Sequence, residues 1–134
     1  MKPLVVAAAV IERDGQLLVT RRLKGTHLEG AWEFPGGKCE PHETPAACLV
    51  REIREELGAG VTVGELILVT RHMYAERDVE LHFFSAALQE DPHPLLGQEM
   101  RWVSRAQLAG LDFPEADREL IERLTGAGGS SRPA

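Results

Sequence analysis

The chain has 134 residues, enough for one domain with a substantial core, and its 43% hydrophobic and 27% charged residues are ordinary for a soluble globular protein. No apolar run approaches the roughly 18 residues needed to cross a membrane. The net charge of −6 argues against binding a nucleic acid polymer, which requires a basic face, but not against a small nucleotide whose phosphates are bridged by metal ions.

The chain begins with two predicted strands, the apolar runs Leu4–Ile11 and Leu17–Arg22. Between them, Asp14-Gly15 is a pair favoured in tight hairpin turns. Because the first strand follows a single lysine without a signal-peptide cleavage pattern, we expect a cytoplasmic location. A loop at Lys24–Gly30 leads to a short extended piece, after which Pro35-Gly36-Gly37 is predicted to break regular structure.

A helix is predicted next, with Thr44 as its N-cap, Pro45 at its first position and Gly58 at its end. The buried stripe of this helix is predicted to comprise Ala46, Val50, Ile53 and Leu57.

The second half of the chain alternates further strands with short helices. Strands are expected at 61–70 (with a bulge at Gly64), 79–87 and 100–103, and helices after Ser104 and from Phe113-Pro114 to Leu124. Strands mixed with a few helices predict an α+β sandwich, in which a mixed sheet lies between helices. We expect a single domain over 1–125 and a disordered Gly/Ser-rich tail over 126–134.

The central predicted helix carries three acidic residues, Glu52, Glu55 and Glu56, at spacings that place them on one face. At ~6 Å and an effective dielectric of about 20, each pair of carboxylates repels by roughly 3 kcal/mol. A folded protein avoids this arrangement unless a cation lies between the oxygens. Because no Cys or His is positioned among these carboxylates, the cluster favours Mg²⁺ first, or Mn²⁺.

The two cysteines do not predict a disulfide framework. Cys39, His42 and Cys48 resemble part of a zinc site, but a fourth ligand and the usual second pair are missing. We therefore expect free thiols.

The segment from Gly37 to Ala59 resembles the Nudix hydrolase signature, G-x5-E-x7-R-E-U-x-E-E-x-G-U, where U is a bulky aliphatic residue. The last U position holds Ala59, which is smaller than usual. The flanking Trp32–Lys38 segment resembles the MutT branch, which hydrolyses nucleoside triphosphates. The matching positions are Gly37, Glu43, Arg51, Glu52, Ile53, Glu55, Glu56 and Gly58.

The resemblance implies a Nudix-type α/β/α sandwich and a reaction in which metal-activated water attacks a phosphorus atom. Glu52, Glu55 and Glu56 are then the expected metal ligands, and Glu52 or Glu55 helps to deprotonate the water. The carbonyl of Gly36 or Gly37 is expected to complete the metal shell. Glu43 and Arg51 are expected to support catalysis by forming an ion pair that fixes the loop against the helix.

Several residues are expected to bind the substrate. Arginine's planar fork suits phosphate oxygens, and the resemblance favours Arg22 over Arg21 as the phosphate contact. Lys38 is a similar candidate, and Arg77 is placed to reach the base or the phosphates. Phe34 is a candidate to pack on the base, although a core position is an equally good interpretation.

Alignment by resemblance places Asp117 where MutT itself has an asparagine that reads 8-oxoguanine. An ionised carboxylate accepts hydrogen bonds and suits the N1–H and N2–H₂ of a guanine edge. Toward cytosine it meets the N3 lone pair, unless Asp117 is protonated. A branch of the family that prefers cytidine triphosphate also carries Asp here, and a plain surface position stays an open alternative.

One position departs from the family pattern. MutT-like chains often place a further metal-binding or base glutamate six residues before the tryptophan matched here by Trp102, but this chain has Leu96. Glu99 is a candidate substitute, and without it catalysis rests on the helix cluster alone.

The leading hypothesis is Mg²⁺-dependent hydrolysis of a (deoxy)nucleoside triphosphate to monophosphate and pyrophosphate, with 8-oxo-dGTP as the expected substrate. Alternatives are hydrolysis of CTP, dCTP or a modified pyrimidine triphosphate, and a non-catalytic module that senses a nucleotide. The expected partner is the nucleotide alone, without nucleic acid polymer or membrane, and the chain is a monomer or a homodimer.

Overall fold

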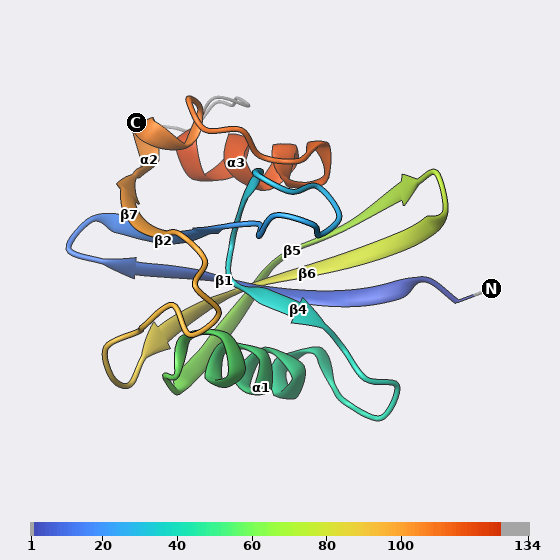
Figure 1. The fold of residues 1–134 in the computed structure, drawn as a ribbon, viewed down its shortest axis with the longest axis horizontal. Helices are drawn as coiled ribbons and strands as arrows, with labels where there is room; N and C mark the ends of the chain where they lie inside the picture. Colours follow the sequence, from blue (N-terminus) through green and yellow to red (C-terminus); the bar gives the residue numbers. More distant parts are fainter. Residues whose placement is uncertain (1, 127–134) are drawn as a thin grey trace.

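The computed structural model describes residues 2 to 126, and in this part of the chain seven strands form one sheet between two layers of helices (Figure 1). This arrangement confirms the predicted α+β sandwich. The strands are β1 (Leu4–Arg13), β2 (Gln16–Arg21), β3 (Trp32–Glu33), β4 (Gly36–Lys38), β5 (Val61–Tyr74), β6 (Arg77–Leu88) and β7 (Met100–Ser104). The helices are α1 (Pro45–Leu57), α2 (Arg105–Leu108), the 3₁₀ turn η1 (Glu115–Asp117) and α3 (Arg118–Thr125).

Strand β1 is the centre of the sheet, whose order is β3-β2-β1-β6-β5, with β4 on β1 and β7 on β2. It pairs in parallel with β6 and antiparallel with β2 and β4, so the sheet is mixed. The β1–β2 turn is the predicted hairpin: Asp14 and Gly15 have φ angles of 52° and 77°, as a two-residue type I′ turn requires.

Alternate residues of β1 belong to two different hydrophobic cores. Ala7, Ala9 and Ile11 pack on the α1 side, whereas Ala8 and Val10 pack on the opposite side with residues of α2 and α3. In Figure 1, α1 lies below the sheet and α3 above it. The period-2 alternation of a strand therefore lets one segment bury both of its faces.

The predicted ends of α1 are confirmed. The Thr44 side chain accepts a hydrogen bond from the Ala47 N–H, and Gly58 ends the helix with φ 64°. The predicted stripe was partly wrong, because Val50 is 41% exposed and Leu49 is fully buried. The buried positions are Cys48, Leu49, Ile53 and Leu57, so the inward face is rotated by about one residue from the prediction.

The predicted break at Pro35-Gly36-Gly37 was partly wrong, because the break falls at Phe34-Pro35 and the two glycines belong to a strand. Gly36 to Lys38 form β4, which pairs with residues Val6 to Ala8 of β1. A β-carbon at Gly36 would overlap the Ala7 carbonyl oxygen, so glycine is what permits this close backbone approach. The pairing fixes the start of the loop that leads to α1.

The later elements follow the predictions with shifted bounds. Strand β5 extends four residues beyond 70, to Tyr74, and its register shifts next to Gly64, between Val63 and Leu66. Ser104 caps α2 in a capping box with Gln107. The last predicted helix begins as η1 before continuing as α3.

Gly126, the first residue of the predicted tail, follows the end of α3 with φ 76°. The rest of that predicted disordered tail, 127–134, lies outside the described residues. Within residues 2 to 126, no helix combines the length and the apolar character needed to span a membrane.

Candidate active site

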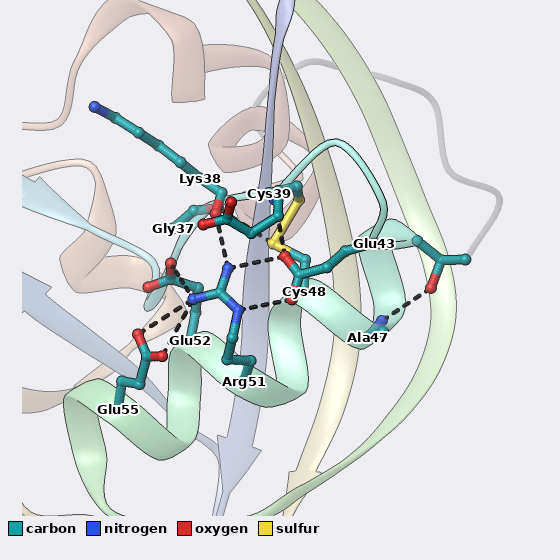
Figure 2. A network of polar contacts seen from close by, with 11 residues as sticks. Gly37, Lys38, Cys39, Glu43, Ala47, Cys48, Arg51, Glu52 and Glu55 are labelled. Carbon is teal, nitrogen blue, oxygen red and sulfur yellow. Dashed lines mark hydrogen bonds and ion pairs between the residues drawn. A yellow bond between two sulfur atoms is a disulfide. The ribbon is translucent and has the colours of Figure 1, made fainter.

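Arg51 is the centre of a polar network between α1 and the loop that precedes it (Figure 2). Its Nε and Nη2 donate to both carboxylate oxygens of Glu43 at 2.6 and 2.9 Å, and Nη2 also donates to the Lys38 carbonyl at 3.0 Å. Its Nη1 donates to Glu52 at 3.1 Å and to Glu55 at 3.2 Å. The Arg51 guanidinium thus connects the loop to the acidic face of α1.

The ion pair of this network shifts the acidity of Glu43. Hydrogen bonds from Arg51, followed by the backbone hydrogen bond from Glu40, lower the pKa of Glu43 to about 2. The same partner, Glu43, raises the pKa of Arg51 further above its usual range. Glu43 therefore stays ionised at neutral pH, and its contact with Arg51 is the one that the sequence predicts.

The expectation of free thiols was wrong, because Cys39 and Cys48 form a disulfide with Cα atoms 5.2 Å apart (Figure 2). Cys39 follows β4, and Cys48 lies one turn into α1 on its buried face. The pairing of β4 with β1 and the packing of α1 beneath the same strand bring the two sulfur atoms together.

Glu56 lies in different surroundings from Glu43. It is partly buried, and burial, followed by the charges of Glu33 and Glu52, raises the pKa of Glu56 to about 9. The Glu52 carboxylate also hydrogen-bonds the Glu56 carboxyl group, and the Gly36 backbone donates to it. The charges of Glu33 and Glu52 thus both act on Glu56, and a shared proton or a cation would relieve their repulsion.

The residues around Glu52 fit a hard divalent cation. A β-carbon at Gly37 would overlap the Glu52 carboxylate, so the glycine backbone forms a cradle that a side chain would fill. The carboxylate and carbonyl oxygens here are the type of ligand that suits Mg²⁺ or Mn²⁺. Among the described residues, no group of three acidic, His or Cys side chains is arranged as a metal shell. Arg51 donates hydrogen bonds to both Glu52 and Glu55.

A cavity of about 950 Å³ opens beside this cluster. It is lined by the backbone at Gly36 and Gly37, and by residues of β1, β3, β6, η1 and the β5–β6 turn. This volume suits a nucleotide-sized ligand. The predicted substrate residues that line it are Arg22, Phe34, Lys38, Arg77 and Asp117.

These residues differ in how freely they face the cavity. Arg22 is held by Glu33 at 3.2 Å and by the His27 carbonyl at 2.8 Å, whereas Lys38 and Arg77 are exposed. Phe34 is only 4% exposed and stacks on Phe113 with ring centroids 5.2 Å apart. Phe34 is therefore a core residue that also contributes to the cavity wall.

Asp117 is not a surface residue, because it is 5% exposed at the end of η1. Burial, with a smaller contribution from the Glu33 charge, raises the pKa of Asp117 to about 7. Near neutral pH this carboxyl group is therefore divided between its protonated and ionised forms.

Glu99, the candidate substitute for the downstream glutamate of MutT-like chains, is engaged by two arginines in the structure. Leu96 lines a small cavity of about 120 Å³ together with Glu56, Glu33 and Arg22. Glu99 instead pairs with Arg21 at 3.3 Å and with Arg101 at 2.9 Å, and it lines neither cavity.

Sequence reasoning missed three residues that line the cavity. The charge of Glu33 raises the pKa of both Glu56 and Asp117. Burial raises the pKa of Glu33 itself, although its ion pair with Arg22 acts in the opposite direction. Tyr74 and His27 form an edge-to-face aromatic pair with ring centroids 5.2 Å apart. The position of Glu33 between two aromatic residues in the sequence could have identified it as a site residue. The contact between His27 and Tyr74 joins residues far apart in the chain, so no local sequence pattern predicts it.

Comparisons with known proteins find one family over nearly the whole chain. A NUDIX domain family model matches residues 6–123. The chain is 38% identical to the CTP pyrophosphohydrolase of Escherichia coli K12, with 100% of this chain and 99% of that protein covered. It is 33% identical to the 8-oxo-dGTP diphosphatase of the same strain, with 92% and 98% covered. The solution structure of the E. coli ORF135 protein superposes with a TM-score of 0.83 at 35% identity, covering 98% of this chain and 96% of that one.

Proposed function

Because this chain belongs to the NUDIX domain family, we propose that it is a metal-dependent pyrophosphohydrolase, which cleaves a nucleoside triphosphate to a monophosphate and pyrophosphate. The observation that carries the proposal is the cavity of about 950 Å³ beside Gly37 and Glu52. It is lined by the positively charged side chains that we propose bind phosphate and by Asp117. We expect the enzyme to act in the cytoplasm.

Glu52, Glu56 and the Gly37 carbonyl are the proposed ligands of a Mg²⁺ ion, and Glu55 joins them if Arg51 releases it. Such an ion supplies charge neutralisation at the phosphates and lowers the pKa of water. The ionised carboxylate of Glu52 or Glu55 accepts the proton of the attacking water. Arg51 and Glu43 hold these carboxylates in place through the network of Figure 2.

The cationic residues of the cavity are proposed to bind the triphosphate. Arg22 presents a guanidinium whose orientation is fixed by Glu33 and the His27 carbonyl, so little side-chain entropy is lost on binding. Lys38 and Arg77 add mobile positive charge from β4 and from the β5–β6 turn. Together they compensate for the repulsion that an anionic substrate meets in a chain of net charge −6.

Asp117 is proposed to select the base. In its protonated form it donates to N3 of cytosine and accepts from N4–H₂, and in its ionised form it accepts from N1–H and N2–H₂ of guanine. A pKa near 7 makes the protonated form available at neutral pH. We propose CTP or dCTP as the first candidate substrate, supported by the higher identity to the CTP pyrophosphohydrolase, with 8-oxo-dGTP as the second candidate because the ionised form matches it.

The test is a panel of CTP, dCTP, dGTP and 8-oxo-dGTP with Mg²⁺, measured by pyrophosphate release at pH 6, 7 and 8. Because the protonated fraction of Asp117 falls as pH rises through about 7, the ratio of kcat/KM for CTP over 8-oxo-dGTP should fall across this range. Asp117→Asn is the matched control, since its amide keeps a donor and an acceptor at every pH and should make the ratio flat.

Other outcomes would select another function. A higher kcat/KM for 8-oxo-dGTP than for CTP at all three pH values would establish sanitisation of the nucleotide pool as the activity. Nucleotide binding without turnover of any member of the panel would identify a sensing module.

A further inference from the structure

We propose that Cys39 and Cys48 are a reversible thiol–disulfide site that controls how tightly the acidic cluster of α1 binds its divalent cation. The two residues are 9 positions apart, and their Cα separation of 5.2 Å lies within the range that a disulfide requires. Disulfides in cytosolic proteins are usually transient or redox-sensing, so the expected cytoplasmic location favours a reversible site over a permanent staple.

The disulfide fastens the loop that carries Glu43. The Cys39 N–H donates to the Val5 carbonyl at 2.9 Å, so the first sulfur is anchored to β1. Cys48 is fully buried in α1, so the second is anchored to the helix. Arg51 joins the same loop to the same helix through Lys38 and Glu43. Among the described contacts, reduction would leave the Arg51 network and the Thr44 cap as the side-chain links between the loop and the helix.

A second contact links the pair directly to the cation site. The Cys48 Sγ atom lies 3.7 Å from the carbonyl oxygen of Gly37. In the disulfide this sulfur has no proton, whereas a reduced thiol can donate toward the carbonyl and compete with a cation for its lone pair. Cys48 also lies one helical turn before Glu52 on the same face of α1. The inference rests on the proposed role of Gly37 and Glu52 in cation binding.

The chemistry requires a two-electron oxidant such as glutathione disulfide. Cys39 is partly exposed, so its thiolate attacks the external disulfide, forms a mixed disulfide and releases one glutathione thiol. The Cys48 thiolate then attacks the Cys39 sulfur and releases the second thiol. Two protein thiols lose two electrons and two protons in total, and one external disulfide becomes two thiols.

The test equilibrates the full chain in glutathione buffers of varied ratio, and counts thiols by alkylation and mass measurement. We expect two thiols to disappear together as the buffer becomes oxidising. The oxidised form should unfold roughly 5–10 °C higher in the absence of metal and nucleotide, because the disulfide restricts the unfolded chain. Calorimetry with Mn²⁺ alone should show roughly tenfold tighter binding by the oxidised form, at the lower end of the effect that changes outside the ligand shell have on metal affinity.

Two single variants separate the two effects of reduction. Cys39→Ser and Cys48→Ala both abolish the disulfide, so neither should respond to the glutathione ratio. Only Cys39→Ser keeps the Cys48 thiol beside the Gly37 carbonyl, so it should bind Mn²⁺ more weakly than Cys48→Ala. If either variant failed to fold, the titration of the unsubstituted chain would still decide the proposal.

Two results would overturn the inference: retention of both thiols in the folded protein under the most oxidising buffer, or equal Mn²⁺ affinity in the two redox forms. Redox-dependent Mn²⁺ affinity without turnover of any nucleotide would support the inference and reject the proposed function. The metal and stability measurements therefore distinguish the two failures.

Discussion

The glutamates of the acidic motif differ because their immediate neighbours differ. Glu43 receives two hydrogen bonds from Arg51, and the pKa of Glu43 falls to about 2. Glu56 is partly buried near other acids, and its pKa rises to about 9. The spacing of these residues predicts that they gather, but it does not predict which carboxylate meets the guanidinium and which meets another acid.

Substitution of Glu55 tests the proposed chemistry at a single carboxylate. The Glu55 side chain is 57% exposed, so Glu55→Gln should leave the thermal unfolding midpoint nearly unchanged. If Glu55 binds the cation or accepts the proton, kcat should fall by roughly 10²–10⁴-fold. Pyrophosphate release at saturating Mg²⁺ measures the effect, and Glu122→Gln on α3 is the control. A kcat close to that of the unsubstituted chain would remove Glu55 from the site.

Gly37→Ala tests the cradle beside Glu52. The added β-carbon would overlap the Glu52 carboxylate, which must move away from its present position. We expect the Mg²⁺ concentration for half-maximal activity to rise by roughly tenfold or more. Gly110→Ala is the control, because its β-carbon would meet its nearest neighbour, the Gln107 carbonyl oxygen, at an ordinary 3.7 Å. An unchanged Mg²⁺ requirement would show that the Gly37 backbone does not serve the cation.

At the scale of elements, local signals predict α1 well because its ends are determined locally. Thr44 and Gly58 cap the helix through their own side chain and backbone, which the sequence displays directly. The inward face of α1, which was only partly predicted, and the strand β4, which was not predicted, depend instead on β1. The Cys39–Cys48 pair also escaped prediction, because only the packing of α1 against β1 brings the cysteines together.

The loop between β4 and α1 should make the fold sensitive to acid. The depressed pKa of Glu43 means that its ion pair contributes stability above the unfolded-state pKa of roughly 4.3, and that this contribution is lost as pH falls toward about 2. Glu43→Gln should therefore lower the unfolding midpoint at pH 6 to 7, and the difference should close near pH 2. Thermal unfolding across pH 2 to 7 checks this, and a pH-independent difference would contradict the ionic explanation.

At the scale of the whole molecule, the sheet joins segments that are distant in sequence. The parallel pairing of β1 with β6 sets Leu4 against Val79, and no local pattern encodes it. The family resemblance supplied the topology that hydrophobic periodicity alone did not. The same long-range pairing brings β1, β3, β6 and η1 around one cavity. The charge of Glu33 on β3 therefore acts on both Asp117 and Glu56, despite their separation in the chain.

This convergence predicts that the metal-free protein loses stability as pH rises from 5 to 9. The folded state keeps protons on Asp117 and Glu56 up to about pH 7 and 9, whereas the unfolded chain releases them near pH 4. Each retained proton lowers the free energy of unfolding by at most about 1.4 kcal/mol per pH unit. Urea unfolding in a chelator at pH 5, 7 and 9 measures the slope, which Glu56→Gln should remove between pH 7 and 9.

Because Mg²⁺ replaces the proton by binding the folded state, it should restore stability most strongly at pH 9. Stability that did not change with pH, or Mg²⁺ stabilisation that was equal at pH 5 and 9, would show that these acids are not gathered for a cation.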